Sequence, residues 1–148
     1  MGLFARIVVG VDGTAWGVAA LEQVLALATP TASVVAVTAL NTRPAGRAAF
    51  DAPHWAEILT NEALTAQKTA AEMLEGRATQ KRGSCAATRS PYWAAHATKT
   101  TLLALGGRHS SRFLGIMLGD TASELLHEAA CSILIARPSP EGKWRRGV

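Results

Sequence analysis

Short apolar runs alternate along the chain with longer segments in which apolar residues recur at helical spacing. The first run covers residues 7–11 and is rich in β-branched side chains, and similar runs cover 33–40, 101–105 and 132–136. Nearly continuous apolar runs of this length are typical of strands buried on both faces of a parallel sheet. We therefore predict buried strands in these four segments.

Helical spacing marks three of the intervening segments. Apolar positions from Val18 to Ala28 predict a first helix that Pro30 ends, and an apolar stripe over 55–74 predicts a long second one. Thr121 and Glu124 have the spacing of a capping box, which predicts a further helix over 121–130. Each predicted helix lies between two predicted strands.

The stretch 77–99 has a weaker pattern. Residues 84–88 are expected to form a strand with little to bury, and Pro91 to open a short helix that ends by 99. Five strands then alternate with four helices, which is the pattern of βαβ units with right-handed crossovers. The prediction is a single-domain α/β fold over 1–138, a three-layer sandwich around a five-stranded parallel sheet, followed by a polar tail over 139–148.

Length and composition narrow the class of protein. The chain has 148 residues, 49% of them hydrophobic and 18% charged, which suits one folded domain. Cys85 and Cys131 are too few and too far apart for a disulfide scaffold or a cysteine zinc site, and they favour a reducing compartment, the cytoplasm. No apolar run approaches the roughly 20 residues of a membrane span, so we expect no membrane partner.

The net charge of +4 is unevenly distributed. Residues 77–119 contain seven Lys and Arg and no Asp or Glu. A cationic stretch without counter-charges attracts anions, although a solvated basic face has the same composition. A small anionic ligand is therefore one interpretation of this segment, and we do not expect a nucleic-acid partner.

Two loops occupy the places where parallel sheets bind ligands. Ligands bind outside the carboxyl ends of the strands, where the strand order reverses, and the loops over 11–14 and 106–121 follow predicted strands. The second loop contains four glycines, Arg108 and Arg112, and it ends at a predicted helix N-terminus. These features suit an anion, while the alternative is a surface loop whose glycines serve turns.

Motifs for other chemistry are missing from the sequence. It contains no P-loop, no G-x-G-x-x-G after the first strand and no G-x-S-x-G nucleophile elbow. The four histidines lie far apart in the sequence, so we expect neither a metal site nor a set of catalytic residues. The pattern favours a binding module over an enzyme.

The chain resembles the universal stress protein family. The resemblance rests on Arg-Ile-Val-Val-Gly-Val-Asp-Gly-Thr over 6–14, and more firmly on 102–137, which ends in Cys-Ser-Ile-Leu-Ile-Ala-Arg. It implies the strand order 3-2-1-4-5 and a homodimer through the last strand. In the nucleotide-binding members it also implies the motif G-x-x-G, nine residues, then G-[S/T].

The motif fits this loop in part. Gly106 and Gly119 take the outer glycine positions with the expected spacing. His109 stands where the second glycine is expected, and Asp120 stands where a Ser or Thr is expected, with Thr121 as a neighbouring hydroxyl. A carboxylate at 120 repels a phosphate unless a cation such as Mg²⁺ bridges the two.

The resemblance implies that ATP or a related nucleotide binds across the two loops. Asp12 would meet its adenosine half, with capping of the first helix as the alternative role for that residue. The candidate nucleotide-binding residues are Val11, Asp12, Gly106, Arg108, His109, Gly119, Asp120 and Thr121.

Two further functions stay open. A dimeric regulatory interaction protein that has lost nucleotide binding would explain His109 and Asp120. A slow nucleotide hydrolase would have to use Asp12 or His109 as its base, since the sequence offers no other candidate.

Overall fold

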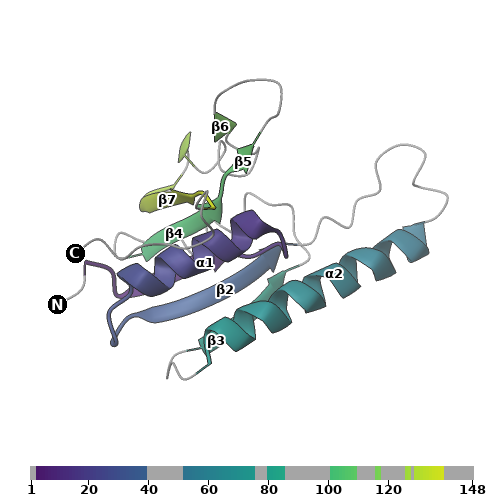
Figure 1. Cartoon of the computed structure of the whole chain (residues 1–148), viewed down its shortest axis with the longest axis horizontal. Helices are drawn as coiled ribbons and strands as arrows, with labels where there is room; N and C mark the ends of the chain where they lie inside the picture. The colour runs from purple at the N-terminus through teal and green to yellow at the C-terminus, as the bar shows by residue number, and fades with distance from the viewer. Residues whose placement is uncertain are drawn as a thin grey trace.

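A central parallel sheet organises the part of the chain that the computed structural model describes, which is residues 3–39, 52–75, 80–85, 101–109, 116–117, 126–127 and 129–138. The sheet has five strands in the order β3-β2-β1-β4-β7, all parallel (Figure 1). The strands are β1 (Arg6–Gly10), β2 (Ser33–Ala39), β3 (Gln80–Cys85), β4 (Thr101–Gly106) and β7 (Ser132–Ala136). The predicted α/β class with a parallel sheet is confirmed, and the strand order is the one that the family resemblance implied.

β1 lies at the centre of the sheet and is paired on both sides. Val8 faces Val35 of β2 and Leu103 of β4 in register. Val8 and Val9 have no exposed surface at all, because one points to each face of a sheet whose two sides are buried. The apolar run that predicted this strand therefore reflects its central position.

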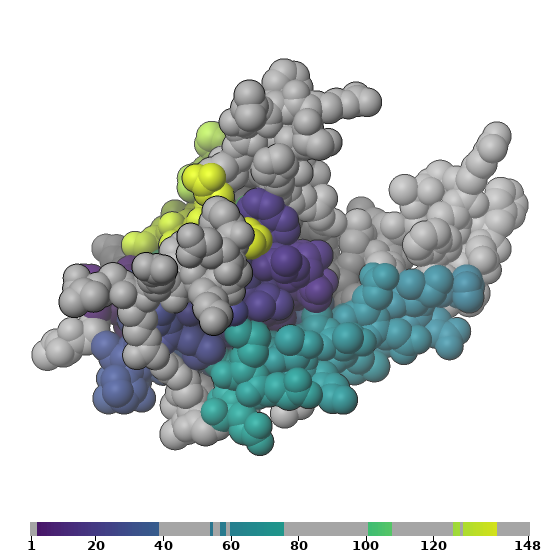
Figure 2. Space-filling model, viewed as in Figure 1, coloured from purple at the N-terminus to yellow at the C-terminus, as the bar shows by residue number. Residues whose placement is uncertain are grey.

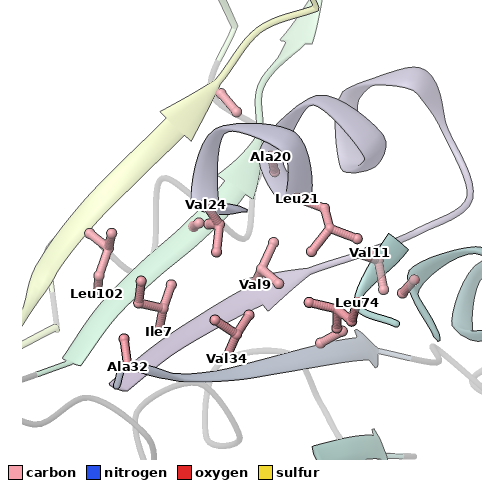
Figure 3. Close-up of a cluster of buried hydrophobic side chains, with 14 residues drawn as sticks. Ile7, Val9, Val11, Ala20, Leu21, Val24, Ala32, Val34, Leu74 and Leu102 are labelled. Carbon is pink, nitrogen blue, oxygen red and sulfur yellow. The ribbon is translucent and has the colours of Figure 1, made fainter. Parts of the chain in front are cut away.

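Two helices, α1 (Ala15–Leu27) and α2 (Ala52–Met73), cover the same face of the sheet (Figure 1). Figure 3 shows Leu21 and Val24 of α1 above Ile7 and Val9 of β1, with Leu74, just after α2, in the same apolar cluster. The space-filling view shows the two helices next to each other (Figure 2), and the cartoon shows α2 continuing beyond the end of the sheet (Figure 1). None of the described helices is both long and apolar enough to cross a membrane.

The opposite face of the sheet carries a second buried apolar cluster. It consists of Val8, Val35, Val37, Leu103 and Leu105, with Ile133 and Ile135 of β7 partly buried against it. The helix expected over 91–99 falls outside the described residues. Of the helix expected over 121–130, Leu126 and His127 are helical, whereas Ala129 and Ala130 are not, so the expected helix end at 130 was wrong. The expected tail over 139–148 also lies outside the described residues.

The third strand of the sheet begins earlier than the sequence pattern predicted. It spans Gln80–Cys85 and pairs with β2 from Val34↔Gln80 to Ala39↔Cys85, so the expected start at 84 was wrong, while 86–88 of the expected strand lie outside the described residues. The segment Gln-Lys-Arg-Gly-Ser-Cys has no apolar period because β3 is an edge strand, held to the sheet by its backbone ladder with β2. Lys and Arg on an edge strand also discourage pairing with another chain.

The loop after β4 contains a short antiparallel ribbon that the sequence did not predict. β5 (Arg108–His109) pairs with β6 (Ile116–Met117), and the ribbon lies beyond the carboxyl end of β4 (Figure 1). Two-residue strands are too short to leave a period in a sequence.

The edge position of β3 predicts that this strand opens more readily than the centre of the sheet. Its amides over 80–85 should exchange with solvent more than about tenfold faster than those of β1 and β4, equivalent to about 1.4 kcal/mol less opening free energy. Hydrogen–deuterium exchange resolved by peptide or by residue measures this difference. Equal protection of all strands would show that β3 is stabilised by more than its single ladder.

Candidate functional site

The two loops named by the sequence meet at the point where the strand order reverses. After β1 the chain crosses over to β2 on one side, while β4 lies on the other side of β1. The carboxyl ends of β1 and β4 are therefore adjacent, which is the usual place for a ligand in an open parallel sheet. The loop after β1 begins at Val11, and the loop after β4 begins at Gly107.

Val11 continues the β1 ladder by one residue. Its backbone N–H donates to the carbonyl of Val37 at 2.9 Å, and its side chain belongs to the core under α1 and α2. Gly13 follows with φ +78°, the only residue of the described chain with a positive φ. The turn therefore leaves the sheet sharply and sets Asp12 at the surface.

The Asp12 carboxylate is fixed by its neighbour Thr14. Oδ1 of Asp12 accepts from the backbone N–H of Thr14 at 3.0 Å and from its hydroxyl at 2.6 Å. The same hydroxyl oxygen accepts from the N–H of Gly17 at 3.3 Å, so Thr14 caps α1. The alternative role of Asp12 as the helix cap is therefore wrong.

This arrangement leaves Asp12 free to act on a ligand. Nothing in the described part of the chain donates to its Oδ2, and the residue is exposed. A carboxylate that is held by one oxygen and open at the other is a preorganised acceptor for hydroxyl or amino groups.

Gly17 leaves room for this position of the Asp12 carboxylate. The sequence did not identify Gly17 as part of the site. A Cβ at this position would lie 2.7 Å from Oδ1 of Asp12 and 3.0 Å from its backbone nitrogen. Glycine in a helix is less favourable than alanine by up to about 1 kcal/mol. A glycine in the first turn of a predicted helix was the available signal, and the contact with Asp12 explains it.

Gly106 is explained by helix packing. A Cβ there would lie 2.6 Å from both the carbonyl carbon and the carbonyl oxygen of Trp16, in the first turn of α1. The next residue, Gly107, donates its N–H to the carbonyl of Ala136 at 2.9 Å. Neither glycine has a positive φ, so residues 106–109 do not form the alternating-handed backbone nest that often holds a phosphate.

Arg108 and His109 follow directly in β5. His109 replaces the second glycine of the family motif, and the extended backbone of β5 accepts any side chain, so this position does not need glycine here. Gly119, Asp120 and Thr121 lie outside the described residues. The structure thus places Val11, Asp12 and Gly106 on adjacent strand ends, with Arg108 and His109 next in the chain.

α2 contributes residues to the same end of the sheet that the sequence did not single out. A Cβ on Gly13 would meet that of Ala66 at 3.6 Å, an ordinary contact distance. Nε2 of the adjacent Gln67 donates to the hydroxyl of Thr38, at the carboxyl end of β2, at 2.7 Å. The Asp12–Gly13 turn therefore has α1 behind it and α2 beside it.

Metal ligands and nucleophiles do not gather at this site in the described chain. Within the described ranges, no three His, Cys, Asp or Glu side chains lie close enough to hold a metal ion. Burial raises the pKa of the Cys131 thiol, and a backbone hydrogen bond at Leu103 opposes this effect without cancelling it. Cys131 is therefore a protonated thiol at neutral pH and a poor nucleophile.

Comparison with known proteins gives one family. A family model described as universal stress protein family matches residues 3–137. A search of the curated proteins finds no match.

Solved structures agree with the family match. Universal stress protein UspA from Lactobacillus plantarum has 20% identity and a TM-score of 0.71 over 90% of this chain and 98% of that one. A universal stress protein in complex with cAMP has 17% identity and a TM-score of 0.53 over 90% and 96%. A family member from Arabidopsis thaliana with AMP bound has 11% identity and a TM-score of 0.50 over 93% and 94%. At these identities the likeness shows the fold.

The close approach of α1 to β4 predicts a large effect of a small substitution. Gly106→Ala should lower the free energy of unfolding by about 2 to 3 kcal/mol, because the backbone of Trp16 must move away from the new methyl group. Urea unfolding followed by circular dichroism measures the loss.

Gly13→Ala is the matched control. It has room for a methyl group and only its positive φ is unfavourable, so it should lose about 1 kcal/mol. An equal or smaller loss for Gly106→Ala would show that helix packing does not explain this glycine.

Proposed function

The chain belongs to the universal stress protein family, and from this premise we propose that it is a stress-response module that binds ATP or a related adenine nucleotide at the carboxyl ends of β1 and β4. The observation that carries the proposal is the Asp12 carboxylate, exposed at the point where the strand order reverses and held by Thr14 through one oxygen. The relatives with cAMP and AMP bound support the choice of ligand class.

Asp12 would bind the nucleoside half of the ligand. Ribose hydroxyls are donors, and a carboxylate already oriented by two hydrogen bonds loses little conformational entropy when it accepts from them. Hydrogen bonds to a charged acceptor contribute about 1.5 to 3 kcal/mol, more than those between neutral groups. The fixed carboxylate therefore favours a sugar hydroxyl as its partner.

The phosphate half would lie over the loop that follows β4. Arg108 is its first cation, and Gly119, Asp120 and Thr121 are its further proposed contacts by resemblance to the family motif. The backbone N–H of Gly107 is already used within the sheet, so phosphate contacts must begin at Arg108. Mg²⁺ would offset the repulsion between Asp120 and a phosphate, and magnesium is accordingly part of the proposed ligand.

A second candidate function is a dimeric interaction protein without nucleotide. Gly106 has a structural explanation in the Trp16 contact, so its presence alone does not argue for a phosphate. β7 is an edge strand with three half-buried apolar residues, Ile133, Leu134 and Ile135. An apolar edge without charged residues favours pairing with a second copy, and we propose a homodimer through β7 under either function.

The cellular location and the end of the domain are further parts of the proposal. We propose a cytoplasmic protein, in agreement with its few cysteines, with a domain that ends near residue 138.

The Asp12 role predicts the effect of removing a single charge. Asp12→Asn keeps an acceptor for Thr14 but replaces the outward oxygen with a donor, so ATP affinity should fall by more than about tenfold while the fold is retained. Isothermal titration calorimetry of both proteins, with and without magnesium, measures the change. Binding of equal strength by Asp12→Asn would remove Asp12 from the site, and no heat from the unmodified protein would leave the interaction protein as the function.

The proposed dimer gives a separate prediction. Ile133→Pro removes a donor from β7 and should convert a dimer into a monomer or an insoluble protein. Light scattering with size-exclusion chromatography gives the mass. A soluble variant with unchanged dimer mass would show that the interface lies elsewhere.

A further inference from the structure

One side of α1 is exposed although this helix is apolar almost throughout. Only Glu22 and Gln23 among its 13 residues are polar. The side toward the sheet is buried, whereas Glu22, Ala26 and Leu27 are exposed, and Leu27 is 60% exposed. A helix that is apolar on all sides is usually buried on all sides. We therefore expect a further segment to cover this side, which consists of Glu22, Gln23, Ala26 and Leu27 and which we name the Gln23 face.

The chain returns to this face as it leaves the last strand of the sheet. Just past β7, the backbone carbonyl of Arg137 accepts from Nε2 of Gln23 at 3.2 Å. The next residue, Pro138, is half-buried, so the chain still lies against the protein where its described part ends. The segment 139–148, the tail, therefore starts beside the Gln23 face.

The sequence of the tail complements this face. Trp144 is its one aromatic residue, with a cation on each side, Lys143 and Arg145. On the Gln23 face, Leu27 offers an apolar side chain, and Glu22 is the only charged residue of α1. An indole buries a large apolar area, and the long stems of Lys and Arg cover apolar surface while their charged ends stay in water. Tail and face therefore match in both apolar surface and charge.

The tail is long enough to make these contacts. Trp144 follows Pro138 by six residues, which span up to about 20 Å when extended. The helix α1 is itself about 20 Å long, and Leu27 lies one turn beyond Gln23 on the same side of it. Trp144 can therefore reach Leu27 without moving any described element.

We propose that the tail docks on the Gln23 face of α1, with Trp144 against Leu27 and with its cations beside Glu22. The occupant of this surface is thus a segment of the same chain, and the inference does not depend on nucleotide binding. The helix that the tail would cover is the one that orients Asp12 through Thr14 and Gly17.

Trypsin tests the docking on the full chain, because it cuts after Lys143, Arg145 and Arg146. A docked segment is cut only in the fraction of molecules in which it is released. Mass spectrometry of the protein after short exposures gives the rate of cutting within the tail. This rate should be at least about tenfold lower than for a synthetic peptide of residues 139–148, and equal rates would overturn the proposal.

Two substitutions with matched controls identify the surface. Leu27→Ala and Glu22→Gln should each raise the rate of cutting about three- to tenfold, because each weakens the docked state. The controls lie on α2, where Leu64 is 63% exposed and Glu57 is exposed as well. Leu64→Ala and Glu57→Gln should leave the rate within about twofold. Equal effects of a substitution and its control would overturn the assignment to the Gln23 face.

Cross-linking distinguishes the tail of the same chain from that of a second copy. A carbodiimide joins a carboxylate to an amine in contact with it, so Glu22 should be linked to Lys143, and Lys143→Arg should keep the charge but lose the link. In a mixture of isotope-labelled and unlabelled protein, the two linked peptides should carry the same label. Absence of the link in the unmodified protein would overturn the docking, and linked peptides of mixed label would show that a second copy occupies the face instead.

Discussion

The pairing of β1 with a strand on each side is the constraint on which the rest of this structure depends. The backbone of β1 fixes the register of both neighbours, β2 and β4. Ile7 of β1, for example, is in register with Val34 of β2 and with Leu102 of β4. Because neither face of β1 is open to solvent, both must be covered, and α1 and α2 cover one of them. The backbone leaves the end of β1 between two fixed neighbouring strands, and Asp12 stands there.

Helix packing and ligand geometry are linked at this end of the sheet. α1 approaches β4 so closely that Gly106 has no room for a side chain, and the same first turn of α1 provides the N–H of Gly17 that binds Thr14. Thr14 in turn holds Asp12. A shift of α1 away from β4 would therefore move the carboxylate, so the stability of the core and the orientation of the site depend on the same contacts.

The sequence was informative where burial decides the structure. The central strands and both described helices follow from apolar patterns, because each buries side chains at a regular period. β3 did not follow, since Gln-Lys-Arg-Gly-Ser-Cys has no apolar period, and the strand pairs with β2 through its backbone ladder. At the site, the rule that ligands bind at the carboxyl ends of parallel strands located Asp12 and Gly106. Their roles came from contacts that only the structure shows, those of Asp12 with Thr14 and of Gly106 with Trp16. Gln67 left no signal, because its partner Thr38 is far away in the sequence.

The two edges of the sheet differ in a way that limits how many copies of the chain could join edge to edge. β7 presents apolar residues, whereas β3 carries Lys81 and Arg82. A filament built by adding sheet to sheet requires every copy to offer two receptive edges. Two copies joined at β7 would turn only β3 outward, and a third copy approaching through its own β3 would bring like charges together. Under the proposed pairing through β7, assembly would therefore stop at two copies rather than continue into a filament.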